Sequence, residues 1–339
     1  MKRWMFLVSV VVLALSVMAS VVEAGTTTIQ DIQSRRYLKC GVLHDYAGFG
    51  YIDGRGNYQG FDVDFCRAIS AALGVEVRYT NLTGKTRFPA LQSNEVDVVL
   101  MLVTQTMSRE TGLGLDFSTV NFYDGQAYMV RKNLGVTSTT QLNGASICLT
   151  SATTGEVNTA DYFRKNRMTY KPVMFERLED SHRAYDEGRC DAVIGQSANL
   201  YALRAELKNP AEHVVLTPYI SKEPMGPVTR GSDRQWTMAV KYIVQALLLA
   251  EELGVTQANV QEMAKNANDP EVRRMLGADG SLGPDAALPK DFALRAIKAV
   301  GNYGEIFERN LGQSTKFKME RGLNALWSKG GLYYPIPFK

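Results

Sequence analysis

Several residue types and patterns are scarce in this chain, and each scarcity excludes a class of protein. The 339 residues include only three histidines (His44, His182 and His213), which lack ligand spacing, and no Cys-x-x-Cys pair. No metal site or other cofactor is therefore predicted. The formal net charge is +3 and the basic residues are dispersed, which argues against nucleic acid as a partner. No Ser/His/Asp set is visible, so no catalytic residues are predicted.

Long hydrophobic runs are confined to the N-terminus. Lys2 and Arg3 precede an apolar run, Trp4–Met18, that is short for a membrane span. The sequence Val22-Glu23-Ala24 fits the small-x-small rule, so residues 1–24 are predicted to be a signal peptide cleaved after Ala24. An uncleaved N-terminal anchor is the alternative. No cysteine lies at the cleavage site, which argues against a lipid anchor, and no later run is long enough to span a membrane.

The first part of the mature chain alternates strand and helix signals. Strands are expected at 37–43 and 75–79, and an apolar run at 96–103 is typical of a strand covered on both faces. A Gly-rich loop is expected at 44–60, and a helix follows it with Asp62 as its N-cap. This order implies a doubly wound α/β sheet.

The alternation then restarts, which indicates a second α/β unit. Strands are expected at 145–149, 190–194 and 214–217, and helices at 154–166, 179–188 and 198–207. From Asp233 onward the pattern is mostly helical without strands, so these helices are expected to pack on the first sheet.

Two α/β units joined by two crossovers predict a two-lobed clamshell. We assign residues 25–131 and 231–339 to lobe 1 and residues 132–230 to lobe 2. Ligands of open α/β sheets bind beyond the carboxyl ends of the strands, so the site is expected in the cleft between the lobes.

Four cysteines in an exported chain favour disulfides, and three pairings are possible. The layout puts Cys40 and Cys66 in one lobe and Cys148 and Cys190 in the other. We therefore predict the pairs Cys40–Cys66 and Cys148–Cys190. Four buried free thiols are the alternative.

Three segments carry a family resemblance. The string Gly60-Phe61-Asp62-Val63-Asp64-Phe65-Cys66-Arg67-Ala68-Ile69 closely resembles the hallmark of family 3 of the bacterial solute-binding proteins, which serve ABC importers of polar amino acids. The late segments 298–309 and 321–327 resemble the general L-amino-acid-binding subfamily. By pattern alone these segments are amphipathic helices.

The resemblance implies a type II periplasmic-binding-protein clamshell with its helical C-terminal extension on lobe 1. It implies a monomeric periplasmic receptor that closes on a small carboxylate ligand, an amino acid or a derivative, and delivers it to an inner-membrane ABC permease. A similar fold occurs in periplasmic cyclohexadienyl dehydratases, so that enzyme is the rival. Its general acid would have to be His44, Asp45 or Glu156. A sensory ligand-binding module is a second rival, disfavoured because no downstream membrane span is visible.

Arg109 is the strongest candidate ligand residue. It follows the carboxyl end of the 96–103 strand, and a guanidinium can hold a carboxylate in a bidentate fork. The resemblance implies the same role for Arg109, and implies that Thr104, five residues earlier, binds near the ammonium or carboxylate. A surface ion pair of Arg109 with Glu110 or Asp116 is the alternative.

Thr153 and Thr154 start the helix after the first strand of the second lobe. Hydroxyls and free amide groups at a helix start can hold an anion, and the resembling family places a Gly-Thr-Thr motif there. Ordinary N-capping by threonine is the alternative, and the two are compatible.

Gln196 departs from the family pattern. The family usually has Asp or Glu at this position to pair with the ligand's α-ammonium, and an uncompensated buried ammonium is costly. Either another acid, such as Asp45 or Glu156, replaces the missing charge, or the chain binds an unusual amino acid or a carboxylate without a free amine.

Two further residues are assigned to the ligand site. Phe49 is expected to supply the aromatic wall that the family places in the first loop, with ordinary loop packing as the alternative. Arg87 precedes a helix that faces the cleft in the family, where a second arginine would suit a second acidic group.

Overall fold

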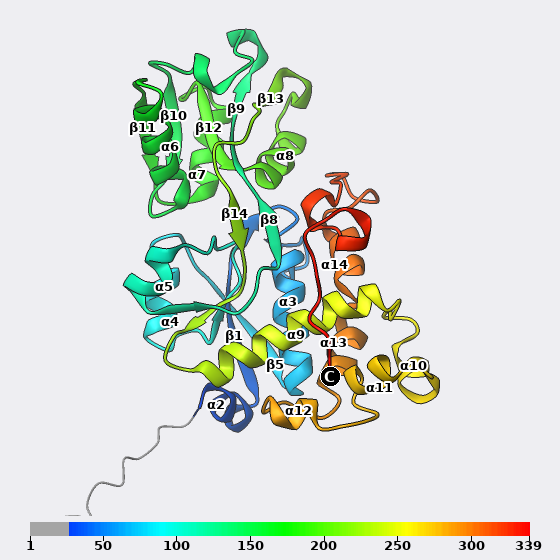
Figure 1. The fold of residues 1–339 in the computed structure, drawn as a ribbon. Helices are drawn as coiled ribbons and strands as arrows, with labels where there is room; N and C mark the ends of the chain where they lie inside the picture. Colours follow the sequence, from blue (N-terminus) through cyan, green and yellow to red (C-terminus); the bar gives the residue numbers. More distant parts are fainter. Residues whose placement is uncertain (1–26) are drawn as a thin grey trace, which may run out of the picture.

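Two five-stranded sheets frame the part of the chain that the computed structural model describes, residues 27–339 (Figure 1). The predicted signal peptide and its cleavage after Ala24 lie outside the described residues. Within residues 27–339, no helix combines the length and the apolar character that a membrane crossing requires.

The first sheet has the strand order β5-β1-β6-β15-β7, in which β5, β1 and β6 run parallel. Only the centre of the apolar run at 96–103 forms a named strand, but the whole run is buried. The strands are β1 (Tyr37–Val42), β5 (Glu76–Asn81), β6 (Val98–Val99), β7 (Leu115–Phe117) and β15 (Val228–Arg230), and the helices are α2 (Thr28–Arg35), α3 (Phe61–Leu73), α4 (Arg87–Gln92) and α5 (Met107–Leu113).

The second sheet repeats this plan with the order β11-β10-β12-β9-β13. Its strands are β9 (Gln126–Arg131), β10 (Ser146–Thr150), β11 (Lys171–Phe175), β12 (Ala192–Gln196) and β13 (His213–Val215). Its helices are α6 (Thr154–Lys165), α7 (Leu178–Asp186) and α8 (Ser197–Glu206), with 3₁₀ turns η1 (Lys132–Leu134), η2 (Thr139–Gln141) and η3 (Pro210–Glu212).

A two-stranded ribbon, β8 (Phe122–Asp124) and β14 (Glu223–Met225), runs between the two lobes (Figure 1). Strand β9 directly follows it and pairs with β12, whereas β15 directly follows β14 and pairs with β6 and β7. The boundaries assigned at 131/132 and 230/231 therefore put β9 and β15 in the wrong lobes. Only a Gly125 turn separates β8 from β9, so the sequence pattern shows no break at the actual crossover.

The segment between β1 and α3 was expected to be a loop, but it forms a small antiparallel sheet. Its strands are β2 (Asp45–Tyr46), β3 (Gly50–Ile52) and β4 (Tyr58–Gln59). Gly60 ends this sheet with φ 128°, and a Cβ there would lie 2.3 Å from the carbonyl oxygen of Phe49, so only glycine fits.

Gly60 is also the N-cap of α3, so the prediction that Asp62 caps this helix is wrong. The helix begins at Phe61, which places Asp62 inside the first turn. Its buried carboxylate accepts a hydrogen bond from the Leu102 amide at 3.0 Å. Burial raises the pKa of Asp62 to about 7, because a charge is costly away from water.

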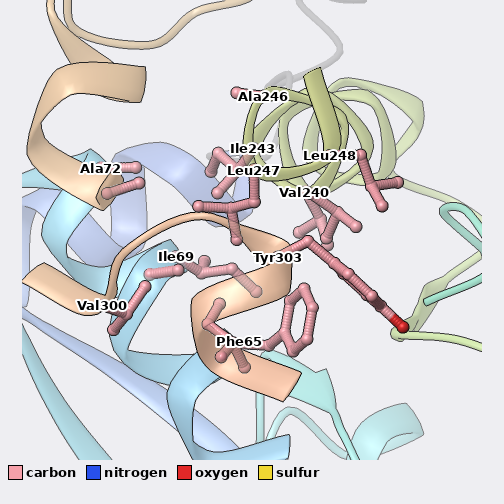
Figure 2. Close-up of a cluster of buried hydrophobic side chains, with 14 of the residues drawn as sticks. Phe65, Ile69, Ala72, Val240, Ile243, Ala246, Leu247, Leu248, Val300 and Tyr303 are labelled. Atoms are coloured by element: carbon pink, nitrogen blue, oxygen red, sulfur yellow. The ribbon is translucent and has the colours of Figure 1, made fainter. Parts of the chain in front are cut away.

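The C-terminal helices pack on the first lobe, as predicted. The long helix α9 (Arg234–Glu252) and helix α13 (Phe292–Val300) both pack against α3. Figure 2 shows Ile69 of α3, Leu247 of α9 and Val300 of α13 meeting in this core. The other elements are α10 (Val260–Asn266), α11 (Pro270–Met275), α12 (Leu282–Asp285), α14 (Tyr303–Asn310), η4 (Gly322–Asn324) and η5 (Trp327–Lys329).

Both predicted disulfides are confirmed. Cys40 of β1 is bonded to Cys66 of α3 with a Cα–Cα distance of 6.2 Å. Cys148 of β10 is bonded to Cys190, just before β12, with a Cα–Cα distance of 5.7 Å. Each bond lies within one lobe, so neither restrains the cleft.

Candidate functional site

A cavity lies between the lobes, beyond the carboxyl ends of the parallel strands. Its floor and walls come from both sheets: Leu43 follows β1, Leu82 follows β5, Thr150 ends β10 and Glu176 follows β11. Parallel strands expose their ends at one edge of a sheet, which is why these segments converge. The cavity also contains Arg87, Thr104, Arg109, Thr153, Thr154 and Gln196, all of which were assigned to the ligand site from the sequence.

Arg109 is held in the first turn of α5, whose N-cap is Thr106. Its side chain is buried, and Nη1 donates to the carbonyl oxygen of Thr104 at 2.5 Å. Burial lowers the pKa of Arg109, and the nearby charge of Glu223 opposes that shift. Within residues 27–339 no ion pair joins Arg109 to Glu110, which is hydrogen-bonded to Gln105, or to Asp116.

Arg87 is the first residue of α4 and is also buried. Its Nη2 donates to the carbonyl oxygen of Ala152 across the cleft at 3.2 Å, and its Nε has no partner among the described residues. Burial and the neighbouring Arg109 lower its pKa to about 9. Two buried guanidinium groups therefore face one cavity, and an anion there would relieve both desolvation and mutual repulsion.

Neither threonine at the start of α6 caps that helix with its side chain. The Thr153 hydroxyl donates to the carbonyl oxygen of Thr150 at 2.7 Å, and the Thr154 hydroxyl donates to Glu223 at 2.9 Å. The alternative, that these threonine side chains only cap α6, is therefore wrong. The amide groups of the first helical turn are left as the donors that an anion could use.

Gln196 ends β12 on the other side of the cavity. Its Oε1 lies 3.3 Å from the hydroxyl of Tyr46 in lobe 1, which donates to it across the cleft. Two further cross-lobe contacts, Lys85 with Glu176 and Arg87 with Ala152, accompany this bond. The lobes are thus in contact at the cleft.

The prediction that Phe49 covers the ligand disagrees with its position. Its ring is 0% exposed and packs edge-on against Tyr46, Phe61 and Phe122. Phe49 follows the left-handed Gly48 in the β2–β3 turn, and its ring packs in the core of lobe 1. Tyr46, three residues earlier, is the aromatic that lines the cavity.

Glu223 was missed by the sequence interpretation. It lies on the ribbon strand β14, is 2% exposed, and accepts hydrogen bonds from Thr104 and Thr154. In the sequence it is one charge in the polar segment Ser221-Lys222-Glu223-Pro224, with nothing to set it apart from a solvated loop. Its role depends on the ribbon, which only the fold reveals.

The other acids proposed to replace the missing charge differ in position. Asp45 lines the cavity, and its Oδ1 is buried without a hydrogen-bond partner among the described residues. Burial raises the pKa of Asp45, and the adjacent His44 partly opposes this. Glu156 instead accepts from the Ala152 amide at 3.0 Å and lies outside this cavity. No group of acids, histidines and cysteines suited to a metal ion occurs in the described part of the chain.

A two-lobed α/β frame with a cationic cleft defines a solute-binding protein of the type II periplasmic fold. The match to the family model for bacterial extracellular solute-binding proteins, family 3, covers residues 38–313. The chain therefore belongs to this family, as its motifs predicted, and the clamshell fold is confirmed.

The names of two similar proteins refer to amino acids, and one similar structure was solved with glutathione bound. The general L-amino acid-binding periplasmic protein AapJ of Rhizobium johnstonii is 49% identical over 93% of this chain and 94% of its own. The glutamate/glutamine/aspartate/asparagine-binding protein BztA of Rhodobacter capsulatus is 46% identical over 100% of both chains. An ABC transporter periplasmic binding protein of Brucella ovis, solved with glutathione bound, superposes with a TM-score of 0.89 at 48% identity, covering 93% of this chain and 100% of that one.

These relatives are named as binding proteins, and the Brucella ovis protein is named as one of an ABC transporter. Since this chain belongs to the same family, it is a solute-binding receptor and not an enzyme. The rival interpretation, a cyclohexadienyl dehydratase, is supported only by a distantly similar solved structure. An ancestral amino-acid-binding precursor of that enzyme superposes with a TM-score of 0.59 at 27% identity, over 68% of this chain and 96% of that one.

Proposed function

We propose that this receptor captures an amino acid, or a small amino-acid derivative, by its carboxylate. The observation that carries the proposal is the pair Arg87 and Arg109, both buried on one cavity and free of ion pairs within residues 27–339. Closure would hold the carboxylate between the Arg109 fork and the amide groups that start α6. The amino-acid names of AapJ and BztA support this ligand class, and the glutathione-bound relative extends it to short peptides.

The remaining roles are proposed by analogy with the family. The receptor acts in the periplasm as a monomer after cleavage behind Ala24, and an inner-membrane ABC permease recognises its closed form. Thr104, Thr153, Thr154 and Gln196 complete the cavity around the ligand, with Tyr46 as the aromatic wall in place of Phe49. Arg87 adds a second cation that suits ligands with a second acidic group.

A thermal-shift screen of ligand-stripped, refolded protein tests this proposal. The panel contains L-glutamate, L-glutamine, L-aspartate and glutathione, each beside an amine-free acid of similar length. A ligand present at a hundred times its Kd adds about 2.7 kcal/mol to the free energy of unfolding, which is enough for a clear shift. We expect at least one of these acids to stabilise the protein. A panel without any shift contradicts the proposed ligand class.

A further inference from the structure

A buried acid lies behind the ligand cavity, on the ribbon that joins the lobes. Oε2 of Glu223 accepts from the hydroxyls of Thr104 and, at 2.9 Å, Thr154. Oε1 accepts from Nδ2 of Asn158 at 2.9 Å and from the hydroxyl of Ser221 at 2.6 Å. An ionised carboxylate has about four acceptor positions, and here each has a donor. Glu223 does not line the cavity, but Thr104 and Thr154 do.

These bonds fix the polarity of the two threonines. A hydroxyl has one hydrogen to donate, and an ionised carboxylate can only accept. Each threonine therefore uses its hydroxyl hydrogen in the hydrogen bond to Glu223. The Thr154 hydroxyl also accepts from Nε2 of Gln126 at 3.0 Å. Toward the cavity, Thr104 and Thr154 can therefore only accept hydrogen bonds. They suit the N–H groups of an ammonium and cannot donate to a ligand carboxylate.

The charge distribution in the cleft points the same way. Arg87 and Arg109 contribute two cations, and Gln196 is neutral where a counter-charge was expected. Glu223 places a negative charge one hydroxyl away from the cavity, on the far side of Thr104. A hydroxyl bound to a carboxylate is a strengthened acceptor, since hydrogen bonds in a chain polarise one another.

Two other acids near the cleft are arranged differently. Asp124 lies directly opposite Glu223 in the ribbon, but its carboxylate accepts from Ser197 and from the amides of Ala198 and Gly125, away from the cavity. Asp45 lines the cavity from lobe 1, and an oxygen of its carboxylate has no partner among the described residues. Asp45 is therefore the competing counter-charge.

We propose that Glu223, acting through the hydroxyls of Thr104 and Thr154, makes this receptor select ligands that carry a primary ammonium group. Glu223 takes the place of the acid that Gln196 lacks. It is a specificity-determining residue that does not touch the ligand. The inference rests on the proposed function, in which Arg109 holds the ligand carboxylate.

The test compares Kd values, measured by calorimetry, for L-glutamate and its amine-free counterpart glutarate. The proteins are the wild type and the variants Glu223→Gln, Thr104→Val, Asp45→Asn and Arg109→Ala. Glu223→Gln keeps the shape and removes the charge. Thr104→Val keeps the charge and removes the hydroxyl, so it carries the test if the first variant does not fold. Circular dichroism and unliganded Tm values verify folding.

We expect the wild type to prefer L-glutamate. Glu223→Gln and Thr104→Val are expected to weaken L-glutamate binding about tenfold to a hundredfold, with little change for glutarate, because a hydrogen bond to a charged group is lost. Equal losses for both ligands, or a loss of preference only in Asp45→Asn, would overturn the role of Glu223. Arg109→Ala separates the two proposals, because it removes binding of both acids if the carboxylate clamp is correct.

Discussion

The two lobes are built on one plan but offer the ligand different chemistry. In the first sheet, β1, β6 and the antiparallel strand β15 lie side by side in that order. In the second sheet, β10, β12 and the antiparallel strand β9 lie in the same order, and β15 and β9 each adjoin the ribbon in sequence. Lobe 1 supplies the buried cations Arg87 and Arg109, whereas lobe 2 supplies Gln196, hydroxyls and the start of α6. The shared fold therefore fixes where a ligand binds, and individual side chains divide the work of binding it.

One pair of residues shows the repeat at atomic detail. Asp97, just before β6, accepts from the Lys39 amide of β1 at 2.8 Å, and Asp191, just before β12, accepts from the Ser146 amide of β10 at the same distance. Burial raises the pKa of Asp97, which also contacts Arg35. Hydrogen bonds from Ser146 lower the pKa of Asp191. The pKa values of these two equivalent carboxyl groups are thus shifted in opposite directions, because Asp97 is buried whereas Asp191 is only half-buried and its hydrogen bonds prevail.

The largest expected effect on ligand binding comes from removing one of the two cations that lobe 1 contributes. Replacing Arg109 with alanine removes the fork that lobe 1 contributes, and we expect a loss of about 5 kcal/mol in binding, or several thousandfold in Kd. Calorimetry with the tightest ligand of the panel measures it. Arg164→Ala, at an exposed arginine of α6, is the matched control. Unchanged Kd values for Arg109→Ala would contradict the proposal that Arg109 binds the ligand carboxylate.

The second prediction concerns the acids buried in lobe 1. Asp62 has a pKa of about 7 in the folded protein, so the folded state binds a proton more tightly than the unfolded chain does. The free energy of unfolding therefore falls as pH rises from about 4 to about 7, by up to about 4 kcal/mol. Urea unfolding at several pH values should show this slope, and Asp62→Asn should reduce it.

Asp191 in lobe 2 provides the contrast, because its pKa is lowered in the folded protein. Its contribution to stability is present above its unfolded pKa, near 4, and is lost as pH falls below that value. Asp191→Asn should therefore lower stability at pH values above about 4 and have little effect at strongly acidic pH, where the wild-type carboxyl is also uncharged. The same slope between pH 4 and 7 in Asp62→Asn and wild type would show that Asp62 does not carry the effect.

The disulfides give a third comparison of the lobes. Cys148–Cys190 closes a longer loop than Cys40–Cys66, with sequence separations of 42 and 26. By restricting the unfolded chain, each disulfide is expected to add about 3–4 kcal/mol to the free energy of unfolding. Cys40–Cys66 lies within the large core of lobe 1, whereas Cys148–Cys190 lies in a smaller cluster. We expect the double serine variant of Cys148 and Cys190 to lower Tm more than the corresponding lobe 1 variant. Calorimetric scans of both measure the order, and the reverse order would contradict it.

The smallest expected effect on ligand affinity comes from Gln196, the uncharged residue that lobe 2 contributes to the cavity. Gln196→Leu removes the acceptor of the Tyr46 hydroxyl and costs about 1 kcal/mol, or about fivefold in Kd. Its effect should be far below that of Arg109→Ala in the same titration. Comparable losses for the two variants would mean that lobe 2 binds the ligand as strongly as lobe 1.

Much of the fold could be predicted because its signals are local. The helical pattern after Asp233 predicted the C-terminal helices on lobe 1, among them α9 (Arg234–Glu252) and α14 (Tyr303–Asn310), since a helix buries one stripe of side chains. The lobe boundaries could not be predicted as well. Strands β8 and β9 follow each other with only Gly125 between them, and which sheet each joins is a long-range choice.

The sequence by itself determined the family, both disulfides and the positions of Arg87, Arg109, Thr104, Thr153, Thr154 and Gln196 at strand ends, because motifs and strand ends are encoded locally. Only the tertiary structure decided the orientation of Phe49 and the place of Glu223. A side chain's surroundings depend on segments far away in the chain: Phe49 packs against Phe122, and Glu223 meets Thr104 across 119 positions. That is why the charge missing at Gln196 was visible in the sequence, whereas the buried acid proposed to replace it was not.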